Sequence, residues 1–198
     1  MTRLEHLSRE ARACRICEAH LPLGPRPVFR VSSTARLLIV GQAPGRLVHE
    51  TGIPWNDRSG DRLRDWLGVE REVFYDERRI AILPMGFCYP GIDKHGGDNP
   101  PRPECAPAWQ ARFLAFMPRI ELTLLVGSYA QAFYLGAGPG TSLTETVAAW
   151  RDHPKTFLPL PHPSWRNTAW LKRNSWFERE LLPVLRRRVA GLVRGKRA

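Results

Sequence analysis

Two loops rich in glycine, proline and polar residues each follow an apolar run of the sequence. The first begins at residues 41–45 (Gly-Gln-Ala-Pro-Gly), directly after residues 37–40 (Leu-Leu-Ile-Val), and continues to Gly60. The second occupies residues 161–167 (Pro-His-Pro-Ser-Trp-Arg-Asn). Open α/β sheets bind ligands at the carboxyl ends of their strands, where such loops present backbone N–H groups and polar side chains. The two loops therefore predict one ligand site built from both.

Four cysteines form a second candidate site. Cys14 and Cys17 are a C-x2-C pair, whereas Cys88 and Cys105 lie later in the chain. No sequence feature indicates export, so we do not expect disulfides. Four thiolates are a ligand set for a [4Fe–4S] cluster or for zinc, and ligand type alone does not separate the two. Buried structural cysteines without a metal are the alternative that the spacing leaves open.

The charge of the chain is strongly positive. There are 30 Lys and Arg residues against 19 Asp and Glu residues, which gives a formal net charge of +11. This excess favours a polyanionic partner, because neutralising phosphates releases their counterions. A genome that prefers arginine is the alternative explanation. The basic end of the chain, about residues 186–198, is either a solvated tail or a DNA-contacting face.

The overall composition is that of one folded domain. Hydrophobic residues make up 43% of the 198 residues, which argues against disorder and allows a sizeable core. No run approaches the roughly 20 apolar residues that a membrane span needs. Charges interrupt Leu4, Leu7 and Ala11, so residues near the start do not resemble an export signal. We expect a cytoplasmic monomer with a single domain over 1–198.

Strand and helix patterns alternate along the chain. We expect strands at 36–41, 79–87, 122–126 and 157–160. Pro84 has no N–H for a ladder, so it would lie at a strand end or bulge. Helices are expected at 3–13, from an N-cap at Ser59 or Asp61 to Leu67, and at 105–117, 128–135, 142–151, 166–173 and 175–194, with loops at 89–104 and 136–141. This order is typical of an α/β fold, a three-layer α/β/α sandwich with a four-stranded, mainly parallel sheet.

The motifs in the two loops match those of a known family. Residues 41–45, 52–55 (Gly-Ile-Pro-Trp) and 58–60 (Arg-Ser-Gly) align without a gap with a Gly-Glu-Ala-Pro-Gly loop, a Gly-x-Pro-Phe segment and an Arg-(Ala/Ser)-Gly turn. Residues 162–164 (His-Pro-Ser) match the second motif of the same family. The chain resembles the uracil-DNA glycosylase superfamily, most closely its iron–sulfur (family 4 type) branch. The four cysteines also fall where that branch has its cluster ligands.

The resemblance implies a fold, a reaction and a cofactor. The fold would be a small α/β/α sandwich with a four-stranded parallel sheet. The reaction would be hydrolysis of the N-glycosidic bond of a deaminated base in DNA. The cofactor would be a structural [4Fe–4S] cluster on Cys14, Cys17, Cys88 and Cys105, with zinc as the alternative.

The resemblance also implies roles for single residues. Such an enzyme extrudes its target base from the DNA stack. Trp55 would supply an aromatic face for that base, and His162 would donate a hydrogen bond to its O2 as negative charge develops. Arg166 would fill the gap in the stack or hold a phosphate, whereas Asn167 has a helix-capping turn as its alternative role. Contacts to the substrate would come from Gly41, Ala43, Trp55, Ser164, Arg166 and Asn167, and Gln42 would be one of the catalytic residues.

The first loop departs from the family at the position of the water-activating carboxylate. Gln42 stands where the iron–sulfur branch has Glu, and Ala43 stands where the best-known uracil glycosylases have Asp. The water must therefore be held by Gln42 and backbone groups, or activated by a residue from elsewhere. His49 and Glu50, in the same loop, are our candidates for this catalytic role, and Asp57 is a weaker third.

A second departure concerns base recognition. The family usually reads the uracil edge with an Asn near the end of the second strand, where this chain has Pro84. The pocket would then read another deaminated base, use a different residue to read uracil, or be weakly active. Pro84 and Ala43 favour a non-catalytic DNA-binding or damage-sensing module, whereas His162, Trp55 and Gln42 favour a DNA glycosylase. A zinc-stabilised enzyme acting on a free nucleotide is disfavoured by the basic charge.

Overall fold

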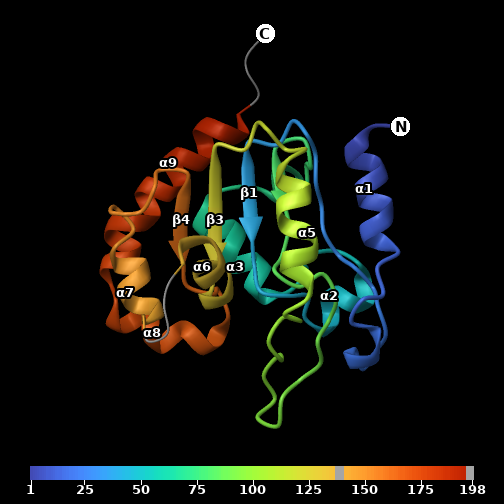
Figure 1. Ribbon diagram of the computed structural model, residues 1–198. Helices are drawn as coiled ribbons and strands as arrows, with labels where there is room; N and C mark the ends of the chain where they lie inside the picture. The colour runs from blue at the N-terminus through green and yellow to red at the C-terminus, as the bar shows by residue number, and fades with distance from the viewer. Residues whose placement is uncertain (137–140, 195–198) are drawn as a thin grey trace.

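A four-stranded parallel sheet forms the centre of the molecule. A computed structural model describes residues 1–136 and 141–194 (Figure 1). The strands are β1 (Leu37–Val40), β2 (Ile80–Ile82), β3 (Leu122–Val126) and β4 (Phe157–Leu160), in the spatial order β2-β1-β3-β4. Every neighbouring pair is parallel, so the predicted α/β sandwich with a four-stranded sheet is confirmed. The order reverses between β1 and β3, which is where open α/β sheets bind ligands.

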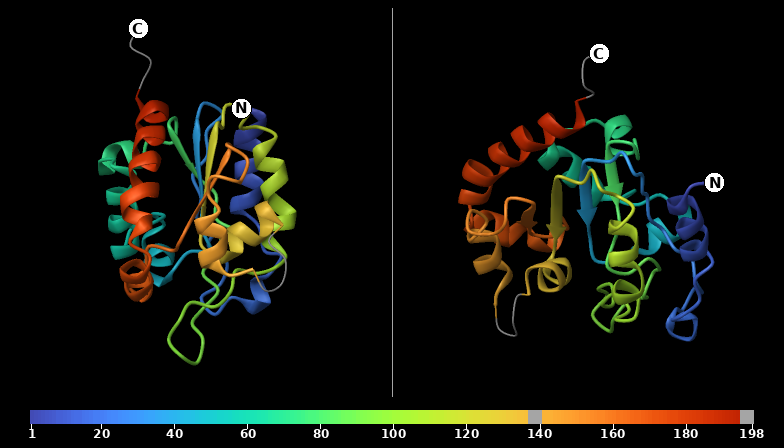
Figure 2. Two further views of the ribbon diagram at one scale, coloured as in Figure 1. Left: turned by 90° about the vertical axis from the view of Figure 1, so that its left-hand side faces the viewer. Right: turned by 45° about the horizontal axis from the view of Figure 1, so that its top comes forward.

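Helices cover both faces of the sheet (Figure 2). Successive strand residues point to opposite faces, so Leu37 and Ile39 belong to one core cluster and Leu38 and Val40 to the other. The first face packs against α3 (Arg58–Leu67), α4 (Arg71–Phe74), α7 (Leu143–Ala148) and α9 (Leu182–Val193). The second face packs against α1 (Arg3–Arg12), α5 (Cys105–Leu114) and α6 (Ser128–Leu135).

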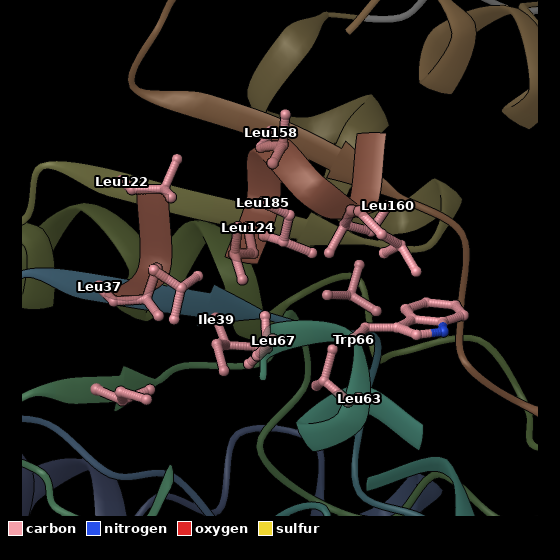
Figure 3. Packing of buried hydrophobic residues seen from close by; sticks show 14 of the residues in the cluster. Leu37, Ile39, Leu63, Trp66, Leu67, Leu122, Leu124, Leu158, Leu160 and Leu185 are labelled. Atoms are coloured by element: carbon pink, nitrogen blue, oxygen red, sulfur yellow. The ribbon is translucent and has the colours of Figure 1, made fainter. Parts of the chain in front are cut away.

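The first core is built mainly from leucine side chains. Figure 3 shows Leu63, Trp66 and Leu67 of α3 and Leu185 of α9 packed against the strand residues Leu37, Ile39, Leu122, Leu124, Leu158 and Leu160. Because α3 begins next to the first loop, this packing fixes the start of the helix against the sheet. None of the helices in the described part of the chain is long and apolar enough to cross a membrane.

Several element boundaries differ from the prediction. β2 ends at Ile82 rather than at residue 87, because Pro84 cannot continue the ladder. Backbone bonds nevertheless hold this segment beside the end of β1, with the Met85 N–H donating to Gly41 O at 2.9 Å. α3 begins at Arg58, so its N-cap is Asp57 and not Ser59 or Asp61. The helices predicted at 3–13, 105–117 and 142–151 are also shorter in the structure.

The chain also contains short helices that the sequence did not predict. α2 (Arg46–Thr51) and α4 are too short to show a helical period in the sequence. The helices predicted at 166–173 and 175–194 are present: the segment after β4 forms a 3-10 turn (Trp165–Asn167) and α8 (Thr168–Arg173), and a π-helical stretch (Phe177–Leu181) leads into α9. The predicted turn at 136–141 lies mostly outside the described residues, and so does the last part of the basic end at 186–198. The described beginning of that basic end is helical.

Candidate active site

The loops after β1 and β4 line one pocket at the carboxyl edge of the sheet. The pocket has a volume of about 630 Å³. Trp55 from the first loop and His162 from the second lie side by side in it, with 5.5 Å between ring centroids and 31° between ring planes. The two loops therefore meet as predicted. The polar and charged lining residues are Gln42, Asp57, Arg58, Ser59, Asp98, His162, Ser164, Arg166 and Asn167.

Trp55 is held in an unusual backbone conformation. Its φ angle is 56°, and among the described residues it is the only one besides glycines with a positive φ. A bulky residue in this region costs about 1–3 kcal/mol, so its surroundings must over-determine the conformation. The indole lies close against Gly41, where a Cβ atom would be only 2.8 Å from Cζ2 of Trp55. Gly41 thus leaves the space into which the aromatic wall fits.

The first turn of α3 also lies very close to Trp55, which gives a stability prediction. A Cβ atom at position 60 would lie 1.8 Å from the Trp55 carbonyl oxygen. We expect Gly60→Ala to reduce the free energy of unfolding by about 1–3 kcal/mol or more, because the backbone must shift. Gly191→Ala in α9 is the control. Its Cβ meets nothing within 4 Å, so helix propensity should give a gain of about 0.5–1 kcal/mol. Urea unfolding measures both, and an unchanged Gly60→Ala variant would refute the close approach.

His162 has a defined tautomer. Its Nδ1 accepts a hydrogen bond from the backbone N–H of Ser164 at 3.2 Å, so the proton of the neutral ring is on Nε2. Burial lowers the pKa of His162, and the negative charge of Asp57 opposes this shift. The imidazole is therefore neutral near pH 7 and has one N–H to donate to a ligand.

The lowered pKa of His162 predicts a pH dependence of stability. The folded-state pKa lies below the unfolded value of about 6.5, so the unfolded chain binds more protons as the pH falls through this range. The corresponding stability is present above about pH 6.5 and is lost as the pH falls through the folded pKa. We expect the unfolding free energy of His162→Asn to fall less steeply than that of the wild type between about pH 7 and pH 5. Denaturant titrations at several pH values test this, and equal slopes would contradict it.

Asp57 both caps the start of α3 and lines the pocket. As the N-cap of α3, its Oδ1 accepts a hydrogen bond from the Gly60 N–H at 2.8 Å. The same side chain lines the pocket and interacts electrostatically with the ring of His162. A carboxylate is thus fixed next to the imidazole by the local geometry of the helix start.

Asp98 contributes a second carboxylate from the loop between β2 and α5, which extends beyond the end of the sheet (Figure 1). Burial raises the pKa of Asp98, and Asp57 and Asp93 add to the shift while Arg166 opposes it. The loop is closed by an antiparallel bridge between Ile92 and Asp98. No motif marked Asp98 in the sequence, because only the fold brings this loop to the pocket.

The two leading candidates for water activation are not among the residues that line the pocket. Glu50 forms an ion pair with Arg46 at 2.9 Å, four residues earlier on α2. The ring of His49 lies beside Tyr89, with 6.0 Å between centroids. Leu47 and Val48 of the same helix do line the pocket. The helical turn, which the sequence did not reveal, places the side chains of His49 and Glu50 outside the pocket. Asp57 is therefore the carboxylate of the first loop that lines the pocket.

A comparison with known families supports the reading of this site. Residues 29–186 match the sequence model of the Uracil DNA glycosylase superfamily. The chain belongs to this superfamily. Members of the uracil-DNA glycosylase superfamily are DNA glycosylases, which are hydrolases that act on DNA, and the match includes the four strands and both pocket loops. It begins after Cys14 and Cys17, so the iron–sulfur branch stays a prediction.

Two positions at which this superfamily member departs from the expected motifs lie on the pocket wall. The side-chain Nε2 of Gln42 donates to the carbonyl of Asn99 at 3.1 Å, which leaves its Oε1 as an acceptor. Pro84 lines the pocket without a polar side chain, and its carbonyl accepts a bond from Gln110 at 2.8 Å. Next to Pro84, Val28 and Ile82 make this wall apolar. Gln42 on this wall and Asn167 in the second loop are therefore the side-chain amides that line the pocket.

The second motif folds into a turn that carries His162. Nδ2 of Asn167 donates to the His162 carbonyl at 2.8 Å, so Asn167 closes this turn, and its predicted substrate contact stays a prediction. Arg166 donates to the carbonyl of Gly96 at 2.7 Å, which ties the turn to the loop that carries Asp98. The contacts of Arg166 and Ser164 to DNA also stay predictions.

The four cysteines come from three parts of the chain. Cys14 and Cys17 follow α1, Cys88 follows β2, and Cys105 is the first residue of α5; all four are free thiols. Burial raises the pKa of Cys88 to about 11 and that of Cys105 to about 12, and neighbouring cysteines add to both shifts. The backbone N–H of Phe87 donates to Sγ of Cys105 at 3.3 Å.

The four cysteines match a metal site in the chemical type of their ligand atoms. Electrostatic interactions link Cys105 to the other three thiols, so the four donors are neighbours. Across residues 1–136 and 141–194, no three His, Cys, Asp or Glu side chains are already arranged as ligands of a metal ion. Four unpaired, neighbouring thiols match the ligands of an iron–sulfur cluster or of zinc. Binding either would require the thiols to reorient and lose their protons.

Proposed function

We propose that this protein is a DNA glycosylase that removes uracil or a related deaminated base from DNA. The observation that carries the proposal is the pairing of Trp55 and His162 in one pocket, beside the carboxylate of Asp57. Stacking, hydrogen-bond donation and negative charge are the three functions that hydrolysis of an N-glycosidic bond needs. The superfamily membership and the positive net charge support the same substrate.

The chemistry begins when the base is extruded from the stack and placed against the indole of Trp55. As the bond from C1′ of the sugar to the base nitrogen breaks, its electron pair moves to the base. The Nε2–H of neutral His162 donates a hydrogen bond to the base oxygen that takes up the charge. Because Nδ1 already accepts from the backbone, the ring needs no change of tautomer for this role.

Asp57 is the group that we assign to the sugar and the water. Its negative charge stabilises the positive charge that develops at C1′. A water molecule then forms the new bond to C1′ and transfers a proton to the carboxylate of Asp57. Asp57 thus acts as the general base. The fixed N-cap geometry holds this carboxylate in place, and Gln42 Oε1 is an additional acceptor for the water or a base N–H.

The cleavage reaction can be tested directly. Oligonucleotides that contain uracil, hypoxanthine or xanthine, in single- and double-stranded form, are incubated with the protein. The free base is then measured by chromatography. Release of at least one base supports the proposal, and the ranking of the three identifies the base that the pocket accepts without an Asn at position 84. Tight binding of all three without release would instead support the damage-sensing alternative, which Pro84 and Ala43 favour.

Binding to DNA should depend steeply on salt. A contact face that neutralises several phosphates makes the logarithm of affinity fall linearly with the logarithm of salt concentration. Fluorescence anisotropy with a labelled oligonucleotide between about 50 and 200 mM salt measures the slope. A flat response would show that the excess of basic residues does not form the contact face.

We propose that Cys14, Cys17, Cys88 and Cys105 hold a structural [4Fe–4S] cluster, with zinc as the alternative. When bound, such a group would link α1 to the segments around β2 and α5. The expected result is a brown protein with about four iron atoms per chain. Cys88→Ser should lose the colour and lower the melting temperature, since metal binding adds to folding free energy. Colourless protein with one zinc per chain would overturn the cluster, and metal-free protein would overturn both.

A further inference from the structure

The backbone carbonyl of Trp55 is the target of two side-chain donors. Nη1 of Arg64 lies 3.2 Å from this oxygen, and the hydroxyl of Tyr75 also lies 3.2 Å from it. The same hydroxyl is 3.0 Å from the carbonyl oxygen of Pro54, so its single proton is shared between the two carbonyls. The carbonyl groups of two consecutive pocket-lining residues, Pro54 and Trp55, are therefore held by side-chain donors. Neither donor lines the pocket itself.

Arg64 is an unusual residue for this position because its charge is buried. The residue is only 8% exposed, and buried charges are costly unless they are paired. Its guanidinium contacts Asp61 Oδ1 at 2.5 Å, and it lies 5.3 Å from the ring centroid of Phe74. It is also 3.4 Å from the Tyr75 hydroxyl. The charge is thus satisfied by a network in which Nη2 faces Asp61, while Nη1 faces the Tyr75 hydroxyl and the Trp55 carbonyl.

These contacts explain how the left-handed conformation persists. Rotation of the peptide group after Trp55 would break the bonds from Arg64 and Tyr75 together. The indole of the same residue lies against Gly41 and beside the ring of His162. The carbonyl contacts therefore hold the backbone that carries the aromatic wall, although neither donor side chain lines the pocket.

We propose that Arg64 and Tyr75 are positioning residues that set the orientation of Trp55 and thereby the affinity for the extruded base. This inference rests on the proposed glycosylase function. Because neither residue lines the pocket, their loss should weaken binding of the base more than it slows bond cleavage. The effect is expected in KM, with kcat nearly unchanged.

Tyr75→Phe tests the inference with the smallest structural change. It removes the hydroxyl and keeps the ring that packs beside Phe74. We expect KM for the cleaved oligonucleotide to rise about five- to tenfold, as expected for a lost hydrogen bond of about 1 kcal/mol or slightly more, with kcat within twofold. The indole N–H resonance of Trp55, assigned by comparison with Trp55→Phe, should shift. Arg64→Met should raise KM similarly, and Arg64→Lys should restore part of the loss.

Tyr134→Phe is the matched control. This half-buried tyrosine donates its hydroxyl to Gln110 Oε1 at 2.7 Å, on the other side of the sheet from Tyr75. It should destabilise the fold to a similar degree, leave the Trp55 resonance unchanged and raise KM less than Tyr75→Phe does, because its partner Gln110 reaches the pocket only through the Pro84 carbonyl. Equal KM effects in both variants, or an unshifted resonance in Tyr75→Phe, would overturn the inference. If the wild type releases no base, the proposed function fails, and the resonance comparison still decides whether the hydroxyl positions Trp55.

Discussion

His162→Ala is expected to reduce the rate of base release by about 10²–10³-fold, the usual cost of removing one donor to a developing anion. The loss should appear in the rate constant for base release under single-turnover conditions, because the hydrogen bond strengthens as charge develops on the leaving base. DNA binding should change much less, since Trp55 and the phosphate contacts remain.

The controls for this experiment separate chemistry from folding. His153→Ala removes a histidine outside the pocket, which contacts the carbonyl of Thr146 at 3.0 Å, and should keep the activity. Circular dichroism should show the same fold for His162→Ala as for the wild type. A correctly folded His162→Ala variant with wild-type kcat would show that the imidazole has no part in the reaction.

Asp57→Asn is expected to lower kcat by about 10²–10⁴-fold, the range typical of a general base, if Asp57 is the carboxylate that activates water. Asparagine is as good an N-cap as aspartate, so the start of α3 should be preserved while the negative charge is lost. Single-turnover kinetics of base release measure the effect. Thermal unfolding of the same variant should show only a small change.

Two further variants determine whether the charge or the cap is responsible. Asp57→Ala removes both, so it should lose stability by about 0.5–2 kcal/mol in addition to losing activity. Asp98→Asn removes the other pocket carboxylate and tests whether that group takes the same role. If Asp57→Asn keeps its activity and Asp98→Asn loses it, the general base is Asp98, in the loop between β2 and α5.

The fold was predictable because local signals agree with one another. Short apolar runs such as residues 37–40 and 122–126 are buried on both faces, as central parallel strands must be. Loop residues with glycine and proline mark the carboxyl ends of β1 and β4, and parallel strands bring these ends to one edge. The pairing of Trp55 with His162 follows from that topology. The predicted strand at 79–87 is longer than β2, because Pro84 has no N–H with which to continue the ladder beyond Ile82.

The position of the acidic groups was much harder to predict. His49 and Glu50 are candidates from the sequence because they lie in the same loop as Gln42. Residues 46–51 form a helix instead, and a helix turns neighbouring side chains to different sides. Asp98 comes from a loop with no recognised motif, so only its three-dimensional contacts place it in the pocket.

The donor to Nδ1 of His162 is a main-chain amide, and this has a consequence for the tolerance of the site to mutation. Every amino acid except proline provides the same N–H at position 164. The protonation pattern of the ring is consequently insensitive to which side chain follows Pro163. Substitutions at position 164 can alter contacts with the substrate, whereas the catalytic proton of His162 stays on Nε2.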